Sequence, residues 1–323
     1  MNQDESRSIN FAAIGVAGYI APRHLKAIHD TGNRLVAAVD VNDSVGILDR
    51  YFQDVKFFKE IERFDRHLEK LRRGPVENRV DYISIMSPNY LHDAHCRLSL
   101  RLGANVICEK PLVINPWNLD QLALIESENP GRINTILQLR VHPSLIALKR
   151  AIEQEGEHQM HDVVLTYVTG RGPWYDISWK GDVEKSGGIA VNIGIHFFDL
   201  LGWLFGSPVD IRVYLAEKRR MSGFVAFEKA KVRWFLSIDK RDLPVPIEPG
   251  KPQTFRSITI DGSQIEFSNQ FTDLHTRVYE KILAGEGFGI DDVRPSIDLV
   301  YKIRNARLVP QDDCAHPMLQ KQD

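Results

Sequence analysis

A histidine and a lysine, His196 and Lys110, stand in segments whose residue types could support the oxidation of an alcohol. Such a reaction requires a base that titrates near neutrality, and imidazole is the usual choice. His196 follows a glycine pair in Gly187–Asp199, where Asn192, His196 and Asp199 stand at i, i+4 and i+7. This spacing predicts three polar side chains on one face of an otherwise apolar helix. A lone histidine there is more often a core residue, but three polar groups on one apolar face are harder to explain that way.

Lys110 lies in the tripeptide Glu109-Lys110-Pro111, which closes a predicted buried strand. Ser87-Pro88-Asn89 closes another. Both tripeptides therefore stand at the carboxyl ends of strands, where open α/β sheets bind ligands. A lysine in that position can hydrogen-bond a substrate hydroxyl and stabilise negative charge as the proton leaves. The alternative is a surface lysine at the start of a loop.

A short loop, Gly15-Val16-Ala17-Gly18-Tyr19-Ile20, connects the first apolar run to a helix pattern that starts at Ala21. Backbone N–H groups at a helix N-terminus bind the pyrophosphate of a dinucleotide. Of the motif GxGxxG only Gly15 fits strictly, because Ala17 and Ile20 hold the other two glycine positions and Gly18 is an additional small residue. The loop by itself leaves the binding of a dinucleotide undecided.

Asp40 closes the second predicted strand, about 25 residues after Gly15. A carboxylate at this place can accept hydrogen bonds from both hydroxyls of the adenosine ribose, and its charge repels the additional phosphate of NADP. The alternative is a solvated acid in a turn or at a helix N-cap. Strand, loop and spacing together predict a dinucleotide site that takes NAD rather than NADP.

Arg171-Gly172-Pro173-Trp174-Tyr175 follows a strand pattern at Val163–Gly170. A guanidinium beside aromatic rings suits an anionic sugar or a nucleotide, because the guanidinium binds carboxylate or phosphate and the rings stack. The same residues also occur in ordinary loop packing. The histidines show no convincing zinc spacing, so no metal site is predicted.

The elements that must position these residues differ between the two parts of the chain. In the first 140 residues, short apolar runs alternate with helical patterns such as Ile61, Phe64, Leu68 and Leu71, as in βαβ units with a parallel sheet. After residue 160 strand patterns dominate and a turn signal stands at Asp261-Gly262. The predicted strands are Ile9–Ile14, Leu35–Val39, Val55–Phe58, Val80–Met86, Asn105–Cys108, Ile133–Leu139, Val163–Gly170, Val209–Ala216, Gly223–Glu228, Val232–Ile238 and Thr254–Asp261.

The fold class that follows is α/β, with two domains. Residues 1–140 are predicted to form a Rossmann domain with a parallel sheet, and residues 141–323 an α+β domain with a mainly antiparallel open sheet. The proline-rich segment Leu243–Pro252 is predicted as a loop. Phe235 is expected on the sheet face away from Trp234, which predicts an apolar surface for a dimer or tetramer contact.

Composition excludes several classes of protein. The chain of 323 residues carries 41 basic and 43 acidic side chains, so a partner nucleic acid or anionic membrane is not expected. The three cysteines are too few for a disulfide framework and favour a reducing cytoplasm. The most apolar stretch, Gly188–Phe205, is interrupted by polar residues and is not predicted to span a membrane.

Together, these motifs resemble the glucose–fructose oxidoreductase/inositol dehydrogenase (Gfo/Idh/MocA) family, in their order and in their spacing. The resemblance runs through nearly the whole chain and is greatest to one branch, the UDP-N-acetyl-2-amino-2-deoxyglucuronate dehydrogenases. It rests on Gly15–Ile28, Asp43–Ile47, Ser87–His92, Ile107–Leu112, Leu137–Arg140, Arg171–Tyr175, Ser178–Asp182 and Phe271–His275.

The resemblance implies oxidation of the sugar 3-hydroxyl of UDP-N-acetylglucosaminuronic acid (UDP-GlcNAcA) by NAD, in the biosynthesis of diacetamido-uronic acids of bacterial lipopolysaccharide O-antigen. It implies His196 as proton acceptor, Lys110 as its catalytic partner, 2-oxoglutarate as a hydride acceptor and a homotetramer. The implied cofactor contacts are Gly15, Gly18, Tyr19, Ile20, Asp40, Ser87, Asn89, His92, Glu109, Lys110 and Gln138. The implied substrate contacts are Lys110, Arg140, Arg171, Trp174, Tyr175, Asn192 and His196.

One departure from the family pattern concerns Asn192, at a position that is commonly aspartate in the wider family. The lost charge argues against a free polyol and suits an anionic substrate. Three alternatives stay open at this point: a dehydrogenase of a free sugar or polyol, an NAD-dependent glycoside hydrolase on the same scaffold, and a non-enzymatic NAD-sensing regulator. The retention of both Lys110 and His196 speaks against the regulator.

Overall fold

The computed structural model describes residues 8–156, 159–244, 253–265 and 273–320, and the chain divides into two compact units. The change from unit 1 to unit 2 at Val141–His142 lies one residue from the predicted domain boundary. The segment Phe271–Val293 belongs to unit 1, however, although it comes late in the sequence. Unit 1 is Met1–Val113, Trp117–Val141 and Phe271–Val293, and unit 2 is Ile114–Pro116, His142–Gln270 and Arg294–Asp323.

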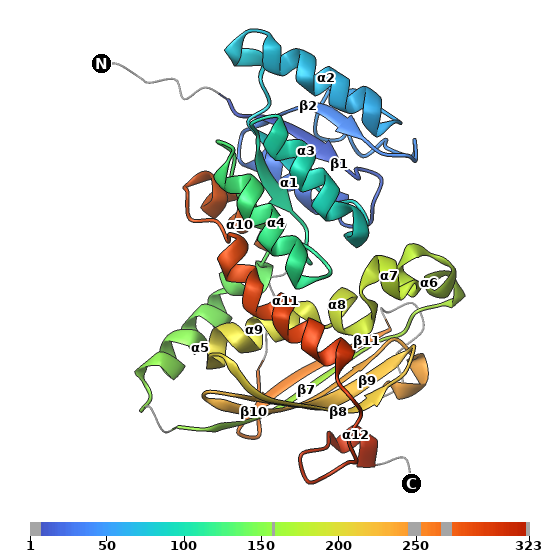
Figure 1. Ribbon diagram of the computed structural model, residues 1–323, viewed down its shortest axis with the longest axis vertical. Helices are drawn as coiled ribbons and strands as arrows, with labels where there is room; N and C mark the ends of the chain where they lie inside the picture. Colours follow the sequence, from blue (N-terminus) through green and yellow to red (C-terminus); the bar gives the residue numbers. More distant parts are fainter. Residues whose placement is uncertain (1–7, 157–158, 245–252, 266–272, 321–323) are drawn as a thin grey trace. The chain divides into compact units, whose positions relative to one another are not determined.

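Unit 1 contains a parallel sheet with the strand order β3-β2-β1-β4-β5-β6 (Figure 1). The order reverses between β1 and β4, and ligands of open α/β sheets bind at this switch point. The predicted parallel Rossmann sheet is confirmed. Its strands are β1 (Asn10–Ile14), β2 (Arg34–Val39), β3 (Lys56–Phe58), β4 (Tyr82–Ile85), β5 (Asn105–Cys108) and β6 (Ile133–Thr135).

The last predicted strand of this sheet is too long. The apolar run Ile133–Leu139 pairs with β5 only as far as Thr135, and Gln138–Val141 form the 3-10 turn η3. Ile136 still donates its N–H to the carbonyl of Cys108, whereas Arg140 bonds locally to Leu137. An apolar run alone does not distinguish a buried strand from a buried 3-10 turn.

Helices cover the sheet of unit 1, and one of them comes from the late segment. The predicted helix with Phe64 and Leu68 on its apolar face is confirmed, since both side chains are buried. Helix α10 packs against α1, and its Val278 and Tyr279 complete the same buried cluster as Leu25. The helices are α1 (Ala21–Asp30), α2 (Ile61–Arg73), α3 (His92–Arg101), α4 (Pro116–Ser127), α10 (Leu274–Leu283) and the start of α11 (Ile290–Asn305), with the 3-10 turns η1 (Val76–Asn78) and η2 (Asn89–Leu91).

Unit 2 contains a mixed sheet with the strand order β12-β11-β7-β10-β9-β8, in which only the β7–β10 pair is parallel. The predicted mainly antiparallel sheet is therefore confirmed. The turn at Asp261-Gly262 has positive φ at both residues, as a two-residue hairpin requires. Of the predicted loop Leu243–Pro252, residues 245–252 lie outside the described residues. The strands are β7 (His161–Thr169), β8 (Pro208–Ala216), β9 (Arg220–Phe227), β10 (Ala230–Ser237), β11 (Thr254–Ile260) and β12 (Ser263–Gln264).

Helices lie on both faces of this sheet, and those on one face are far longer (Figure 1). The helices and 3-10 turns of this unit include α5 (Pro143–Gln154), α6 (Pro173–Ile177), η4 (Trp179–Gly181), α7 (Val183–Ser186), α8 (Gly188–Asn192), α9 (Ile195–Phe205), η5 (Lys240–Asp242) and, on the opposite face, α12 (Pro317–Gln320). Helix α9 supplies Phe198, which meets the fully buried Trp234 of β10 edge to face at 5.4 Å.

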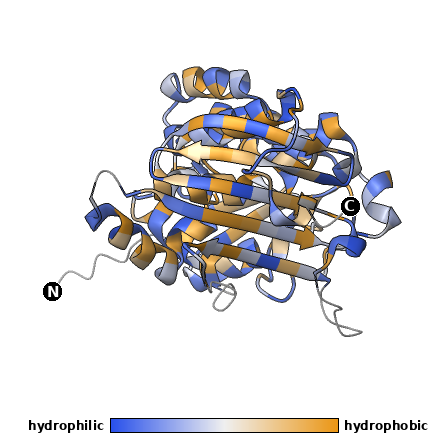
Figure 2. Ribbon diagram, turned by 90° about the horizontal axis from the view of Figure 1, so that it is seen from below, coloured by the Kyte–Doolittle hydropathy of each residue, from blue (hydrophilic) through white to orange (hydrophobic). Residues whose placement is uncertain are grey.

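On the sheet face opposite Trp234, the predicted exposure of Phe235 is wrong. Phe235 is fully buried, because His316 stacks on it at 5.6 Å and Ala315 and Leu319 complete a small apolar cluster. The chain's own C-terminal segment thus covers the apolar patch that we expected a partner subunit to cover. Figure 2 looks onto this face and shows strands on which hydrophilic and hydrophobic residues are mixed.

Among the described residues, no single helix is long and apolar enough to cross a membrane. One bent pair, Val183–Asn192 with Ile195–Phe205, meets the criterion by length and composition alone. Most side chains of α9 are buried within unit 2.

Candidate functional site

The loop between β1 and α1 runs very close to the chain after β4. Gly15 has φ +90°, and a Cβ on it would lie 2.7 Å from the backbone of Met86 and Ser87. Only glycine fits there, which explains why this position of the motif is retained. Gly18 is also tight, since a Cβ would lie 3.2 Å from the carbonyl of Gly15. Ile20 is the N-cap of α1 and Tyr19 is 88% exposed.

Asp40, directly after β2, is tied to this loop. Its Oδ2 accepts a hydrogen bond from the N–H of Ala17 at 2.9 Å, and its Oδ1 accepts one from the N–H of Asn42 at 2.8 Å. The carboxylate thus stands beside the loop, at the carboxyl end of β2, as the sequence predicts. Each oxygen retains a lone pair for a further donor.

Two histidines of α3 contact the residues after β4, and one of them also reaches the residues after β5. Ser87 Oγ is hydrogen-bonded to His95 Nδ1 at 2.8 Å, and burial lowers the pKa of His95 to about 4, so this ring is neutral at physiological pH. His92 is fully buried, with Nε2 2.8 Å from the carbonyl oxygen of Ser87 and Nδ1 2.7 Å from that of Pro111. His92 therefore links the two segments through their backbone.

Glu109 is buried although it is charged. Its Oε1 accepts hydrogen bonds from His24 Nε2 at 2.8 Å and from His275 Nε2 at 3.1 Å. Burial by itself raises the pKa of this carboxyl, but the two histidines hold it well below its ordinary value. By residue type these three side chains could hold a metal ion, since their ligand atoms lie within 4.8 Å of one another. The hydrogen bonds already account for the arrangement, and the expectation of no metal stays a prediction.

Gln138 and Arg140 lie in η3 of unit 1, and both are half-buried. The guanidinium of Arg140 donates to the backbone carbonyl of Asp292 at 2.9 Å and lies 5.7 Å from the ring centre of Phe288. These contacts fix Arg140 against the segment that precedes and begins α11. Its predicted substrate contact stays a prediction.

In unit 2 the predicted substrate residues gather around a lysine. Trp174 is half-exposed, and Tyr175 is buried, with its hydroxyl accepting a hydrogen bond from Asn192 Nδ2 at 2.8 Å. Lys180 Nζ lies 5.2 Å from the ring centre of Trp174 and 5.6 Å from that of Trp179. Burial, together with the positive charge of Arg171, lowers the pKa of Lys180. The structure thus brings Arg171, Trp174, Tyr175 and Asn192 into one cluster with Lys180.

His196 and Asn192 do not belong to one helix. Asn192 ends α8 and His196 lies in the first turn of α9, and the chain bends by 45° between the two segments. A Cβ on Gly194 would lie 2.7 Å from the carbonyl of Ala190, so glycine permits this close break. The prediction of three polar groups on one continuous helix face is wrong. His196 is half-buried, whereas Asp199 is buried.

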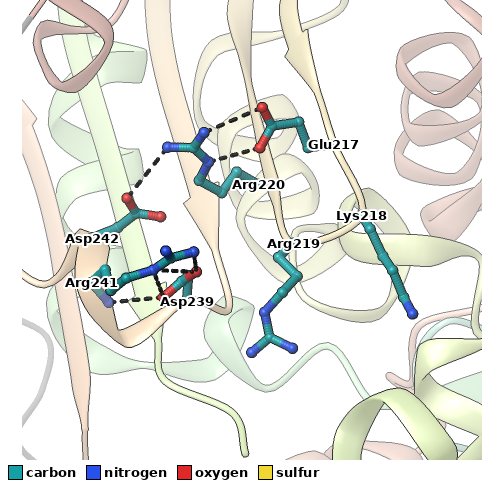
Figure 3. Close-up of a pocket in the computed structure, with 7 residues that line it drawn as sticks. All are labelled: Glu217, Lys218, Arg219, Arg220, Asp239, Arg241 and Asp242. Carbon is teal, nitrogen blue, oxygen red and sulfur yellow. Dashed lines mark hydrogen bonds and ion pairs between the residues drawn. The ribbon is translucent and has the colours of Figure 1, made fainter. Parts of the chain in front are cut away.

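A basic surface cavity in unit 2, of about 490 Å³, is a weaker candidate for an anion site (Figure 3). In Figure 3 Arg220 lies between Glu217 and Asp242, and Arg241 binds Asp239 at 2.6 Å. The remaining cations also have a carboxylate, because both Lys218 and Arg219 pair with Asp176. The cavity is therefore an internally neutralised network of surface ion pairs, which contribute little each. It is lined by Glu217, Lys218, Arg219, Arg220, Asp239, Arg241 and Asp242.

Sequence reasoning missed three residues of these clusters. Lys180 stands in Ser178–Asp182, on which the resemblance rests, and its place directly after Trp179 and close to Trp174 is an available signal for a cation–aromatic contact. His24 and His275 lie within Gly15–Ile28 and Phe271–His275, stretches on which the resemblance rests, but the sequence predicts no role for either side chain. Their shared partner Glu109 is 85 and 166 residues away, so no local pattern could reveal the cluster.

Two family models match the chain. One, described as an oxidoreductase family with an NAD-binding Rossmann fold, matches residues 9–135, and its companion, the C-terminal alpha/beta domain, matches residues 149–223. Among curated relatives, a putative UDP-kanosamine synthase oxidoreductase subunit of Amycolatopsis mediterranei is 32% identical over 42% of this chain and 37% of its own length. Inositol 2-dehydrogenase of Rhizobium meliloti is 24% identical over 63% of this chain and 57% of its own length. The matches thus span about two fifths to three fifths of these relatives.

A solved structure is similar over nearly its whole length. The WlbA (WbpB) dehydrogenase of Thermus thermophilus is 50% identical, with a TM-score of 0.90, and the match covers 96% of this chain and 99% of that chain. That protein was solved with NAD and α-ketoglutarate and also with NAD and UDP-GlcNAcA. The parallel sheet of unit 1 and the mixed sheet of unit 2 fit the descriptions of the matched family models. This chain is therefore an NAD-dependent oxidoreductase of the Gfo/Idh/MocA family.

Proposed function

We propose that this enzyme oxidises the sugar 3-hydroxyl of UDP-GlcNAcA to a ketone, as a step in the biosynthesis of diacetamido-uronic acids of lipopolysaccharide O-antigen. The Thermus thermophilus dehydrogenase, which binds UDP-GlcNAcA in its solved complex, supports this substrate. The substrate carries a diphosphate and a carboxylate, so its site requires several cations.

The observation that carries the proposal is the Arg171–Lys180 cluster of unit 2. Two cations lie close enough for Arg171 to lower the pKa of Lys180, and among the described residues neither side chain forms an ion pair with a carboxylate. The Nε of Arg171 is buried and, in this part of the structure, has no hydrogen-bond partner. Neighbouring unpaired cations repel each other, and an anionic ligand relieves that repulsion. The rings of Trp174 and Trp179 add surfaces on which a base or sugar can pack.

The residues of unit 1 fit NAD. A Cβ at Gly15 would meet the backbone after β4, so the loop approaches closely enough to place N–H groups of the α1 N-terminus at a pyrophosphate. Asp40 would accept the ribose hydroxyls, with Ser87, Asn89 and Gln138 as further contacts. NAD, when bound, accepts a hydride.

We assign the proton chemistry to His196 and Lys110. His196 takes the proton of the sugar 3-hydroxyl through a neutral imidazole nitrogen. Lys110 donates a hydrogen bond to the same oxygen and stabilises the charge that develops on it. Asn192, held by Tyr175, leaves the vicinity of His196 without the negative charge that aspartate would supply.

Removal of either cation tests the substrate. We expect Lys180→Met and Arg171→Met to raise KM for UDP-GlcNAcA roughly tenfold to hundredfold, the value of a lost hydrogen bond to a charged group. NAD affinity should not change. The control is Lys231→Met, which removes an exposed lysine of β10. Steady-state kinetics with native KM in both variants would contradict the assigned anion site.

A second expectation concerns the choice between NAD and NADP. The native enzyme should prefer NAD by roughly a hundredfold or more, because like charges in contact cost several kcal/mol. Asp40→Ser, which retains an acceptor for the Ala17 N–H, should narrow that preference, whereas Asp54→Ser at an exposed position should not. Fluorescence titration with both cofactors measures it. Equal native affinity for NAD and NADP would refute the role of Asp40.

We also propose that the enzyme is a cytoplasmic homotetramer that passes the hydride to 2-oxoglutarate. The Thermus thermophilus complex with α-ketoglutarate supports the acceptor. Since Phe235 is covered within the chain, a subunit contact must use other apolar side chains. Val209 and Leu308 are 73% and 56% exposed and both belong to or adjoin β8, where Leu308 bridges to Val213.

A further inference from the structure

The carboxylate of Glu109 sits at the centre of a directed hydrogen-bond chain in unit 1. Carboxylates only accept, so both histidines must carry their proton on Nε2 where they face Glu109. Nδ1 of His24 is hydrogen-bonded to the hydroxyl of Tyr279 at 2.7 Å, and that hydroxyl is hydrogen-bonded to Ser84 Oγ at 2.8 Å.

The other oxygen of Glu109 points back to the backbone of the neighbouring residue. Glu109 Oε2 accepts the N–H of Lys110 at 3.2 Å. The carboxylate thus joins two histidines on one side to the peptide of Lys110 on the other. His24 comes from α1 and His275 from α10, so the late segment of the sequence reaches the residue before Lys110 directly.

We propose that His275 is a positioning residue for Lys110, acting with His24 through the buried carboxylate of Glu109. The proposal rests on the assignment of Lys110 as a catalytic residue. Glu109 itself is buried, since only 6% of the residue is exposed, and His24 and His275 are still more buried. Glu109 can therefore assist the oxidation of the substrate by holding the backbone of Lys110 in place. A displacement of the lysine by about 1 Å costs up to a hundredfold in rate.

The ionisation of Glu109 makes the proposal measurable. Burial alone would raise the pKa of Glu109, and the two histidine donors oppose it. Loss of the His275 donor therefore raises the pKa of Glu109, so that acidification protonates Glu109 and weakens the hydrogen bond that it accepts from the Lys110 amide. Burial lowers the pKa of His275 itself, so the native ring stays neutral over the working range. The other titratable groups that act on this cluster are Arg23, His24, His92, Cys108, Lys110 and Tyr279.

Two amide substitutions separate positioning from general loosening. The amide nitrogen of Gln extends about as far as Nε2 of histidine, whereas that of Asn extends only as far as Nδ1. We expect H275N to lower kcat about tenfold at pH 8, and the ratio of variant to native kcat to fall about tenfold more by pH 5.5. H275Q should restore most of the native kcat, and its ratio of variant to native kcat should not depend on pH. KM for UDP-GlcNAcA should change little, because Arg171 and Lys180, the cations that we assign to the anionic groups of the substrate, lie in unit 2.

Hydrogen exchange at the Lys110 amide supplies a readout that does not depend on turnover. H275N should lose about tenfold protection at this amide, and H275Q should retain it. If the native enzyme does not oxidise UDP-GlcNAcA but the variants show this exchange pattern, the proposed substrate is wrong and the positioning role of His275 is supported. Equal exchange in native enzyme and H275N, or a kcat ratio independent of pH, would overturn the positioning. Stoichiometric metal in the native enzyme that is absent from H275N would also overturn it, since the histidines would then be ligands.

Discussion

His196→Asn should lower kcat by roughly 10²–10⁴-fold, the usual contribution of a positioned general base. Asparagine retains polarity and approximate size but cannot accept the proton of the sugar hydroxyl. NAD affinity should survive, because the glycine loop and Asp40 belong to unit 1, whereas His196 belongs to unit 2. The native rate should also fall on acidification, since an imidazolium accepts no proton.

A core histidine would behave differently. In that case His196→Asn would lower the melting temperature, while the remaining folded enzyme would keep near-normal turnover. The half-buried position of His196 in the first turn of α9 is compatible with a reacting group, and Phe197 and Phe198 beside it are buried. Melting temperature, NAD affinity and kcat measured on one sample distinguish the two roles. A folded, NAD-binding variant with undiminished turnover would remove His196 from the chemistry.

Lys110→Ala should lower kcat by about 10²–10³-fold, the typical cost of one removed donor at an oxygen that gains charge in the transition state. It should also weaken NAD binding, because Lys110 follows β5 at the carboxyl edge of the cofactor-binding sheet. The matched control is Lys70→Ala on the exposed face of α2, which should leave both quantities unchanged. Isothermal titration with NAD and single-turnover kinetics separate the two effects. Near-native kcat for Lys110→Ala would exclude the assigned role.

The elements of the fold that sequence predicts well are those with a local cause. Strand β5 was predicted with its observed bounds, because Asn105–Cys108 is an apolar run that both neighbouring strands bury. The role of Gly15 also has a local signal in the sequence, since a glycine directly after a strand indicates that another segment of backbone or a ligand approaches closely there. The turn at Asp261-Gly262 has the residues that positive φ requires.

The features that sequence could not predict depend on contacts between distant segments. Phe235 looks like an exposed strand residue until His316 and Leu319 cover it from the C-terminal end. Helical spacing placed Asn192 and His196 on one face, and the break at Gly194 separates them because neighbouring backbone leaves no room for a Cβ. The Glu109 cluster includes His275 of α10. No hydrophobic periodicity in the sequence predicts that this late helix belongs to unit 1.

The most direct test of the proposed function is product analysis by mass spectrometry after incubation of the enzyme with UDP-GlcNAcA, with and without 2-oxoglutarate. We predict a UDP-sugar that is two hydrogen atoms lighter, with the ketone at C3, because one hydride goes to NAD and one proton to His196. With 2-oxoglutarate present, 2-hydroxyglutarate should accumulate in equal amount as the hydride is passed on. Two results would contradict the proposed function. In one, the enzyme binds NAD and oxidises a free sugar or polyol such as inositol but leaves UDP-GlcNAcA unchanged. In the other, it hydrolyses UDP-GlcNAcA to UDP without forming a stable keto sugar.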